Sequence, residues 1–491
     1  MLFNSYEYIF IFLPLSFFIY FLLLQRRLVL AAKGFLVFAS LFFYAWWNIQ
    51  YLPILLFSIL FNYVIGGALN DDVHESKIHK KSLLFVGIIV NLGLLGYFKY
   101  SDFFIENFNV VANASIPLLQ FTLPLAISFF TFQQIAYLVD SYRRETSEYD
   151  FLNYTLFVTF FPQLIAGPIV HHAEMMPQFA SRWNLVKNYK HIAMGLFIFS
   201  IGLFKKVVIA DSFAVWATTG FDHAPVLTFF EAWATSLSYT FQLYFDFSGY
   251  TDMAIGAALL FNIKLPINFN SPYKAVDIQD FWRRWHMTLS RFLKDYVYIP
   301  LGGNREGDFL TYTNLLITFV IAGVWHGAGW TFVFWGLLHG TALVVHRIWK
   351  RLAYKMPRVL AWLITFNFIN IAWVFFRANS WDDVIKVISG MLGLSGMVFP
   401  QALESEIKVL FSSEAILYGD VMQHIGDTLL VSGWVAVGFI IVLAFSNSIK
   451  MMQDNKLEIK DAFLSALYIF VSLLYLYFGQ TVPSEFLYFN F

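Results

Sequence analysis

His326 lies in the apolar stretch IAGVWHGAGW, residues 321–330, where a titratable side chain is unexpected. Between Leu310 and Val345 the chain has no Asp, Glu, Lys or Arg. A neutral imidazole in a dry pocket can act as the general base for a hydroxyl acceptor. A lone histidine on an apolar face can instead be structural. The glycines around His326 and a second buried histidine, His286, favour the general base.

Two helices must hold His326, because apolar runs flank the glycine-rich sequence HGAG on both sides. We expect these helices at about 311–324 and 329–346, with His326 at the tip of the hairpin. A helix of about 14 residues is ~21 Å long, whereas the hydrocarbon core of a bilayer is ~30 Å thick. The sequence therefore predicts that the tip stops inside the membrane.

The stretch DIQDFWRRWHMTLSRFLKDYVYIPLGGNR, residues 277–305, supplies His286 and a group of cations. Read as one helix to about Tyr298, it is amphipathic and projects His286 toward its buried side. Its apolar stripe is Phe281, Trp285, Leu289, Phe292 and Tyr296. Its cations are Arg283, Arg284, Arg291 and Lys294. These cations can meet lipid phosphates at the cytosolic interface, or they can hold an anionic cytosolic cofactor.

Two carboxylates, Asp246 and Asp252, lie in the apolar segment YFDFSGYTDMAIG. Carboxylates at membrane depth are costly and often functional. They can also simply cap a helix or bond a neighbouring hydroxyl. Either interpretation implies a polar interior.

The rest of the chain consists largely of segments that can cross a membrane. Of its 491 residues, 59% are hydrophobic and 13% are charged, whereas a soluble protein carries about 25% charged residues. We expect an all-α polytopic membrane protein with roughly 9–12 membrane segments, forming one domain over residues 1–491. The net charge is zero, which implies no attraction to nucleic acid. Without cysteine, a thioester relay on the chain is excluded.

Basic clusters orient these segments by the positive-inside rule. Arg26, Arg27 and Lys33 follow the first segment, which has no basic region before it and is not a cleavable signal peptide. We therefore expect the N-terminus outside. The lysines between 450 and 460 are expected inside, so the C-terminus is expected outside. The proline- and glycine-broken stretch FVTFFPQLIAGPIVHH predicts a re-entrant segment, and residues 400–427 predict an extramembrane excursion.

Six stretches together resemble the membrane-bound O-acyltransferase (MBOAT) family, in particular the bacterial branch that O-acetylates alginate. They are FFYAWWNIQYL, PLAISFFTFQQIAYLVDSYR, FFPQLIAGPI, YFDFSGYTDMAIG, INFNSPYKAVDIQDFWRRWHMTLSRFLKDYVYIPLGGNR and GVWHGAGWTFVFWGLLHG. The resemblance implies a ring of transmembrane and re-entrant helices around a central funnel, with His326 catalytic and His286 its companion. It also implies acetyl-CoA as the donor substrate, no permanently bound cofactor or metal, and a place in the bacterial cytoplasmic (inner) membrane.

The tail, residues 485–491, fits the pattern FxYxxF through Phe486, Tyr488 and Phe491. This pattern resembles the C-terminus of the small partner protein in bacterial D-alanylation systems, where the tyrosine looks like an acyl relay. Tyr488 is therefore a candidate acyl relay. Terminal aromatic residues can also be plain interfacial anchors.

These observations predict a membrane O-acetyltransferase that passes acetyl groups from cytosolic acetyl-CoA toward an extracytoplasmic polysaccharide, such as alginate or a cell-wall glycan. The resemblance implies a periplasmic or membrane-anchored partner transferase of the SGNH (Ser-His-Asp) esterase type. Two alternatives stay open. One is D-alanyl or other acyl transfer from a carrier protein to a cell-wall polymer. The other is a transporter of acyl groups without chemistry of its own.

Overall fold

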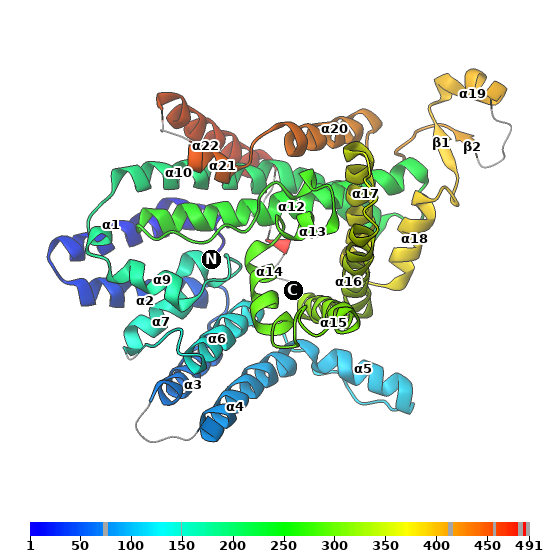
Figure 1. Cartoon of the computed structure of the whole chain (residues 1–491). Coiled ribbons are helices and arrows are strands. Elements are labelled where there is room, and N and C mark those ends of the chain that lie inside the picture. Colours follow the sequence, from blue (N-terminus) through cyan, green and yellow to red (C-terminus); the bar gives the residue numbers. More distant parts are fainter. Residues whose placement is uncertain (72–76, 149, 411–415, 455–457, 480–484, 488–491) are drawn as a thin grey trace.

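The computed structural model describes residues 1–491 apart from 72–76, 149, 411–415, 455–457, 480–484 and 488–491. The described part is helical almost throughout and holds one pair of short parallel strands (Figure 1). The elements used below are α1 Leu13–Gln25, α2 Val29–Ala45, α3 Leu52–Asn70, α4 Lys77–Leu95, η3 Gly96–Tyr100, α5 Ser101–Ala112, α6 Ile127–Tyr142, α7 Phe151–Thr159, α8 Phe161–Leu164, α9 His172–Ala180, α10 Tyr189–Phe204, η5 Lys205–Ala210, α11 Asp211–Thr218, α12 Phe229–Leu260, α13 Ile278–Trp282, α14 Met287–Leu293, η8 Lys294–Tyr298, α15 Asp308–His326, α16 Trp330–Arg351, α17 Arg358–Arg377, α18 Trp381–Met391, β1 Met397–Phe399, α19 Glu404–Leu410, β2 Ile416–Tyr418, α20 Thr428–Ala444, α21 Ser448–Asp454 and α22 Ile459–Gly479.

Eight helices of the described chain are long and apolar enough to cross a membrane, and α2 and α20 are shorter apolar helices. The eight spans are Glu7–Gln25, Ile49–Asn70, His79–Ala112, Tyr189–His223, Asp308–His326, Trp330–Arg351, Arg358–Arg377 and Ile459–Gly479. Large apolar side chains such as Phe18, Phe38 and Phe85 are exposed on their outer faces, as expected for helices that meet lipid. The prediction of an all-α polytopic membrane protein is confirmed.

Helix α12 forms the centre of the molecule, and every residue from Ser238 to Leu260 is buried. Its closest neighbour is α10, which packs along it at two glycine crossings. A Cβ added to Gly256 would lie 2.6 Å from the carbonyl oxygen of Gly195, and a Cβ added to Gly249 would lie 2.8 Å from that of Gly202. Only glycine allows this approach between two helix backbones.

The remaining helices surround α14, which lies near the middle of the view together with the last described residues, drawn in red (Figure 1). Among the segments that enter this interior is the predicted re-entrant stretch. Helices α7 and α8 are separated by a break at Phe160, and the chain from Tyr154 to Val170 is buried without interruption. Such broken backbone is tolerated where protein surrounds it.

Two local predictions are wrong. The stretch from Asp277 to Tyr298 is not one helix, because it breaks at His286, whose φ of 42° is left-handed. Hydrogen bonds from outside the helix hold this break: the backbone N–H of Met287 donates to the carbonyl of Asn268 at 2.9 Å. Helix α15 has 19 residues rather than about 14, since it begins at Asp308, so it is roughly 28 Å long.

Both helices of the hairpin, α15 and α16, are therefore long enough to cross a membrane. The prediction of a first helix too short to do so is wrong. The two helices pack closely, because a Cβ on Gly323 would lie 2.2 Å from the carbonyl oxygen of Phe332. The expected excursion at 400–427 contains β2, whose Ile416 pairs with Met397 of β1 in a parallel register.

Candidate active site

Two buried histidine rings lie together in the interior, as the sequence predicts. The ring centroids of His286 and His326 are 6.4 Å apart. Both side chains are almost fully removed from solvent, with relative exposures of 0% and 2%. His286 is held by the break between α13 and α14, whereas His326 is the last residue of α15. Residues 40 positions apart in the chain are thus brought into one site.

Asn268 fixes the orientation of the His286 ring. Its Oδ1 accepts hydrogen bonds from the backbone N–H of Thr288 at 3.2 Å and from the Thr288 hydroxyl at 2.9 Å. An atom that accepts a backbone N–H is the amide oxygen, so its contact with His286 Nδ1 at 3.1 Å requires a proton on Nδ1. In the neutral ring the lone pair therefore lies on Nε2. This tautomer can accept a proton, as a general base must.

Aromatic rings enclose His326 on several sides. The ring centroids of Trp325, Trp335 and Phe376 lie 4.8, 5.1 and 5.1 Å from that of His326. A third buried histidine, His339, is packed against Trp335 at 4.7 Å. Burying a charged imidazole among such rings is costly, so the site favours neutral histidines.

Lys99 holds the end of α15 at the site, a role that the sequence analysis missed. Its ammonium donates to the carbonyl oxygens of Trp325 at 2.5 Å and His326 at 3.2 Å, and to the Ser128 hydroxyl at 3.2 Å. A cation is favourable at a helix C-terminus, where carbonyls are left without helical partners. The available signal was a lone lysine in the apolar run LGLLGYFKYSD.

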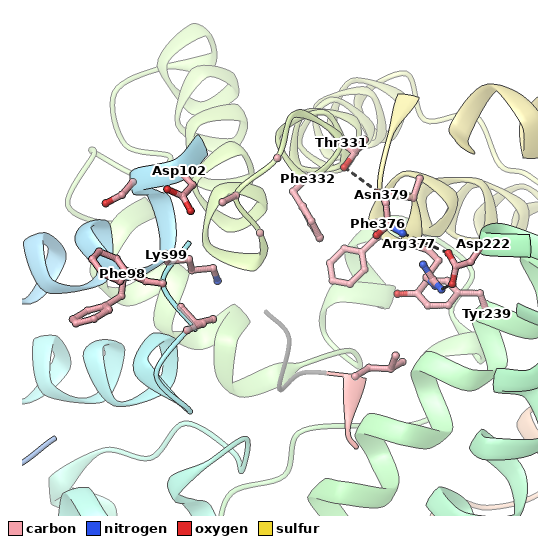
Figure 2. Close-up of a pocket in the computed structure, with 18 of the residues that line it drawn as sticks. Phe98, Lys99, Asp102, Asp222, Tyr239, Thr331, Phe332, Phe376, Arg377 and Asn379 are labelled. Carbon is pink, nitrogen blue, oxygen red and sulfur yellow. Dashed lines mark hydrogen bonds and ion pairs between the residues drawn. The ribbon is translucent and has the colours of Figure 1, made fainter. Parts of the chain in front are cut away.

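A cavity of about 640 Å³, here called the glycine-loop pocket, opens at the tip of the hairpin, where its lining includes Gly327, the residue after His326 (Figure 2). Figure 2 shows Phe98, Lys99 and Asp102 on one side and Tyr239, Phe376 and Arg377 on the other. Its lining also includes Gly327, Ala328, Gly329 and Leu487. Arg377 pairs with Asp222 at 2.5 Å across its wall. The pocket is therefore polar and large enough for a hydroxyl-bearing group.

A second cavity, the basic pocket, lies at the other end of α15 and α16 and has a volume of about 710 Å³. Its cationic lining residues are Arg283, Lys294, Arg305, Arg347, Lys350 and Arg351. Burial raises the pKa of the Tyr298 phenol in this lining, and the nearby Arg347 opposes that rise. Trp282 and Phe319 are part of its apolar lining. Their ring centroids lie 5.1 and 6.4 Å from that of His339.

The four predicted cofactor-binding cations are thus divided. Arg283 and Lys294 face the basic pocket, as expected. Arg291 instead makes a two-fold hydrogen bond with Glu174, at 2.5 and 3.0 Å, and Arg284 pairs with Asp280 at 2.9 Å. Sequence reasoning placed these two on one continuous helix with the others, and the break at His286 removes that helix. The predicted set left out Arg305, which ends the same stretch beyond the expected helix, and Arg347 and Lys350, which belong to α16.

The buried carboxylates of α12 are both paired with lysine. Asp252 binds Lys205 at 2.7 Å, and Asp246 binds Lys206 at 2.7 Å. The lysines are consecutive residues of η5, a segment that the sequence analysis did not single out. Tyr488, the candidate relay, lies outside the described residues, but Leu487 before it lines the glycine-loop pocket.

Packed aromatic rings connect the basic pocket with the buried histidines. Trp282 lines the basic pocket and packs against Trp335 at a ring-centroid distance of 5.9 Å, and Trp335 packs against His326 at 5.1 Å. His326 directly precedes Gly327, which lines the glycine-loop pocket. His339 packs against both Trp282 and Trp335, at ring-centroid distances of 5.1 and 4.7 Å. Such an arrangement can activate a hydroxyl on one side toward an activated acyl group on the other.

Comparison with known proteins agrees with this chemistry. The model of the family described as "MBOAT, membrane-bound O-acyltransferase family" matches residues 117–380. The peptidoglycan O-acetyltransferase of Helicobacter pylori is 50% identical, over 100% of this chain and 98% of that protein. "Probable alginate O-acetylase AlgI" of Pseudomonas aeruginosa is 40% identical, over 80% of this chain and 75% of that one. The teichoic acid D-alanyltransferase of Bacillus subtilis is 27% identical, over 52% of this chain and 69% of its own. The chain belongs to the membrane-bound O-acyltransferase family.

Proposed function

We propose that this acyltransferase moves acetyl groups from cytosolic acetyl-CoA to a hydroxyl in the glycine-loop pocket, for O-acetylation of an extracytoplasmic polysaccharide. The observation that carries the proposal is the buried His286–His326 pair, with ring centroids 6.4 Å apart, at a hairpin that has a cavity at each end. The name of the Helicobacter pylori relative makes peptidoglycan the first acceptor to test.

The basic pocket is the proposed donor site. Arginine recognises phosphate by paired hydrogen bonds, and lysine adds a point charge. Arg283, Lys294, Arg305, Arg347 and Lys350 supply these groups around one recess. A recess of about 710 Å³ suits the phosphates of CoA better than a flat surface for a carrier protein does.

In the proposed reaction His326 is the catalytic base and His286 is its companion. The acceptor hydroxyl gives its proton to the imidazole while its oxygen attacks the thioester carbonyl carbon. The C–S bond then breaks, and the proton passes from the imidazole to the CoA thiolate, which leaves as free CoA. The products are an acetyl ester and CoA. Asn268 acts on the companion ring: it keeps the lone pair of His286 on Nε2, where His286 can accept a hydrogen bond or a proton within the site.

Tyr488 is the proposed first acceptor hydroxyl. Leu487 lines the glycine-loop pocket, and Tyr488 is the next residue in the chain. The acetyl group would then pass to a partner transferase of the SGNH (Ser-His-Asp) type, which would acetylate the glycan. This order requires the glycine-loop pocket to face outward and the basic pocket to face the cytosol of a bacterium, with the chain in its inner membrane and both termini outside.

The test is release of CoA by the purified protein in liposomes that are supplied with acetyl-labelled CoA. His326→Ala should abolish release, whereas His79→Ala, an exposed histidine of α4, should leave it unchanged. Label recovered on a C-terminal peptide of the wild type, and absent from Tyr488→Phe, would support the relay. Normal CoA release by His326→Ala would refute the catalytic assignment. Acetyl label on the partner transferase or the glycan, without any label on the C-terminal peptide, would indicate that Tyr488 is an anchor and not a relay.

A further inference from the structure

Of the last described residues, Glu485 is exposed and Leu487 is half-buried, but Phe486 between them is buried in the protein. Phe486 is 1% exposed, and its ring meets that of Tyr250 in α12 edge-on at a centroid distance of 4.2 Å. Leu487 follows at the edge of the glycine-loop pocket. A segment after the final apolar helix thus inserts Phe486 into the interior, so specific groups must bind it there.

Lys206 is the first of these groups. Its ammonium is buried and has three N–H donors, and each has an acceptor. These acceptors are Asp211 Oδ1 at 2.9 Å, Asp246 Oδ1 at 2.7 Å and the backbone carbonyl of Glu485 at 3.0 Å. The ammonium also lies 5.0 Å from the centroid of the Phe486 ring. The tail therefore completes the hydrogen bonding of a buried cation.

Asp246 binds the tail from the other side. While its Oδ1 pairs with Lys206, its Oδ2 accepts the backbone N–H of Leu487 at 3.1 Å. The tail is thus held by a carbonyl at 485, a side chain at 486 and an N–H at 487. Hydrogen bonds to buried charged groups are strong, and a buried charge that loses one is costly.

Among the described residues, the neighbouring ion pair has no hydrogen bond with the tail. Lys205 pairs with Asp252, and the Ser448 hydroxyl donates to Asp252 at 2.8 Å and accepts from Lys205 at 3.3 Å. This pair is completed by α21, whereas the Lys206 pair is completed by the tail. The two lysines are adjacent in sequence, so they provide a matched comparison.

We infer that Lys206 and Asp246 form a clamp that holds residues 485–487 against η5 and α12, with Leu487 at the edge of the glycine-loop pocket. Both are positioning residues, since they act through the tail. The inference rests on the proposed function only in assigning acyl transfer to Tyr488; the binding of residues 485–487 is independent of it. The clamp also gives the buried Asp246 a specific role.

The experiment measures access to the tail of the full-length protein in lipid nanodiscs. Carboxypeptidase Y is added, and mass spectrometry follows the shortening of the C-terminus. In the wild type, digestion should stop before Leu487. In Lys206→Met and in Asp246→Asn it should pass Leu487 at a rate more than about tenfold higher, because lost hydrogen bonds to charged groups favour local opening. Lys205→Met should digest like the wild type.

Phe486→Ala is a second variant, which leaves the charged residues around Lys206 in place and removes only the ring against Tyr250. It should also release the tail, and it keeps the test decisive if Lys206→Met does not fold. Wild-type protection in Asp246→Asn and Phe486→Ala would overturn the clamp. Equal release in Lys205→Met would do so as well, because it would indicate general loosening. Tyr488→Phe should keep the tail protected while label transfer is lost, which separates failure of the relay from failure of the clamp.

Discussion

Replacing Asn268 by alanine tests the proposed role of His286 most directly. The substitution removes one oxygen that accepts hydrogen bonds from His286 Nδ1, the Thr288 backbone and the Thr288 hydroxyl. The backbone carbonyl of Asn268, which accepts from Met287, is retained. The break before α14 should therefore persist, while the His286 ring loses its preferred tautomer.

The expected size of the effect follows from these contacts. One hydrogen bond contributes about 1 kcal/mol net, and about 1.4 kcal/mol corresponds to a factor of ten in rate. Loss of the tautomer preference alone should lower turnover about fivefold. Looser placement of the ring adds to this, so we expect kcat to fall about 10- to 100-fold. KM for acetyl-CoA should stay unchanged, because Asn268 does not line the basic pocket.

The assay is steady-state CoA release in liposomes, with Asn62→Ala as the matched control. Asn62 is also fully buried and also shares hydrogen bonds with another residue, Asn91, but it lies on α3. Turnover of Asn268→Ala within about twofold of the wild type would refute the tautomer argument, since it implies less than ~0.5 kcal/mol. An equal loss in Asn62→Ala would attribute the effect to stability.

Three further outcomes are expected. Lys99→Met should lower CoA release at least tenfold, because the carbonyls at the end of α15 lose a charged donor; unchanged release would remove Lys99 from the site. Arg347→Gln should raise KM for acetyl-CoA and weaken the dependence of this KM on salt. Arg291→Gln, which breaks a pair with Glu174, should change neither quantity. If Arg291→Gln had these effects and Arg347→Gln had none, the cations predicted from one continuous helix would be the correct set. Gly323→Ala should destabilise the protein by more than about 2 kcal/mol, because the added Cβ would meet a backbone carbonyl oxygen. Thermal unfolding in nanodiscs measures this effect. Gly34→Ala, which has open space around the added Cβ, should have no such effect.

The sequence is sufficient to predict the membrane helices and the two histidines, because charge-free runs and a buried imidazole are local signals. It is not sufficient to predict how His286 is held. The left-handed conformation at this residue depends on hydrogen bonds to Asn268, 18 positions away, and the apolar stripe of 281–296 fits a continuous helix equally well.

Contacts between distant parts of the sequence also explain why the lining of the basic pocket was only partly predicted. Arg305 and Arg347 come from segments on either side of the hairpin, so their proximity depends on how α15 and α16 pack. Charge alone could not separate them from Arg291, which is neutralised by Glu174 of α9. The sequence also could not predict that Lys206 and Asp246 act together, because the tail that both residues bind begins 239 residues after Asp246.

The burial of α12 has a consequence for how the protein is made. This helix carries Asp246 and Asp252 and is not among the eight helices apolar enough to cross a membrane. On insertion scales each aspartate at the centre of a helix costs about 3 kcal/mol, so a translocon would not release α12 into lipid by itself. Lys205 and Lys206 are synthesised just before it and neutralise both carboxylates. We therefore expect α10, η5, α11 and α12 to leave the translocon as one unit, in which the two lysines are already paired with the aspartates.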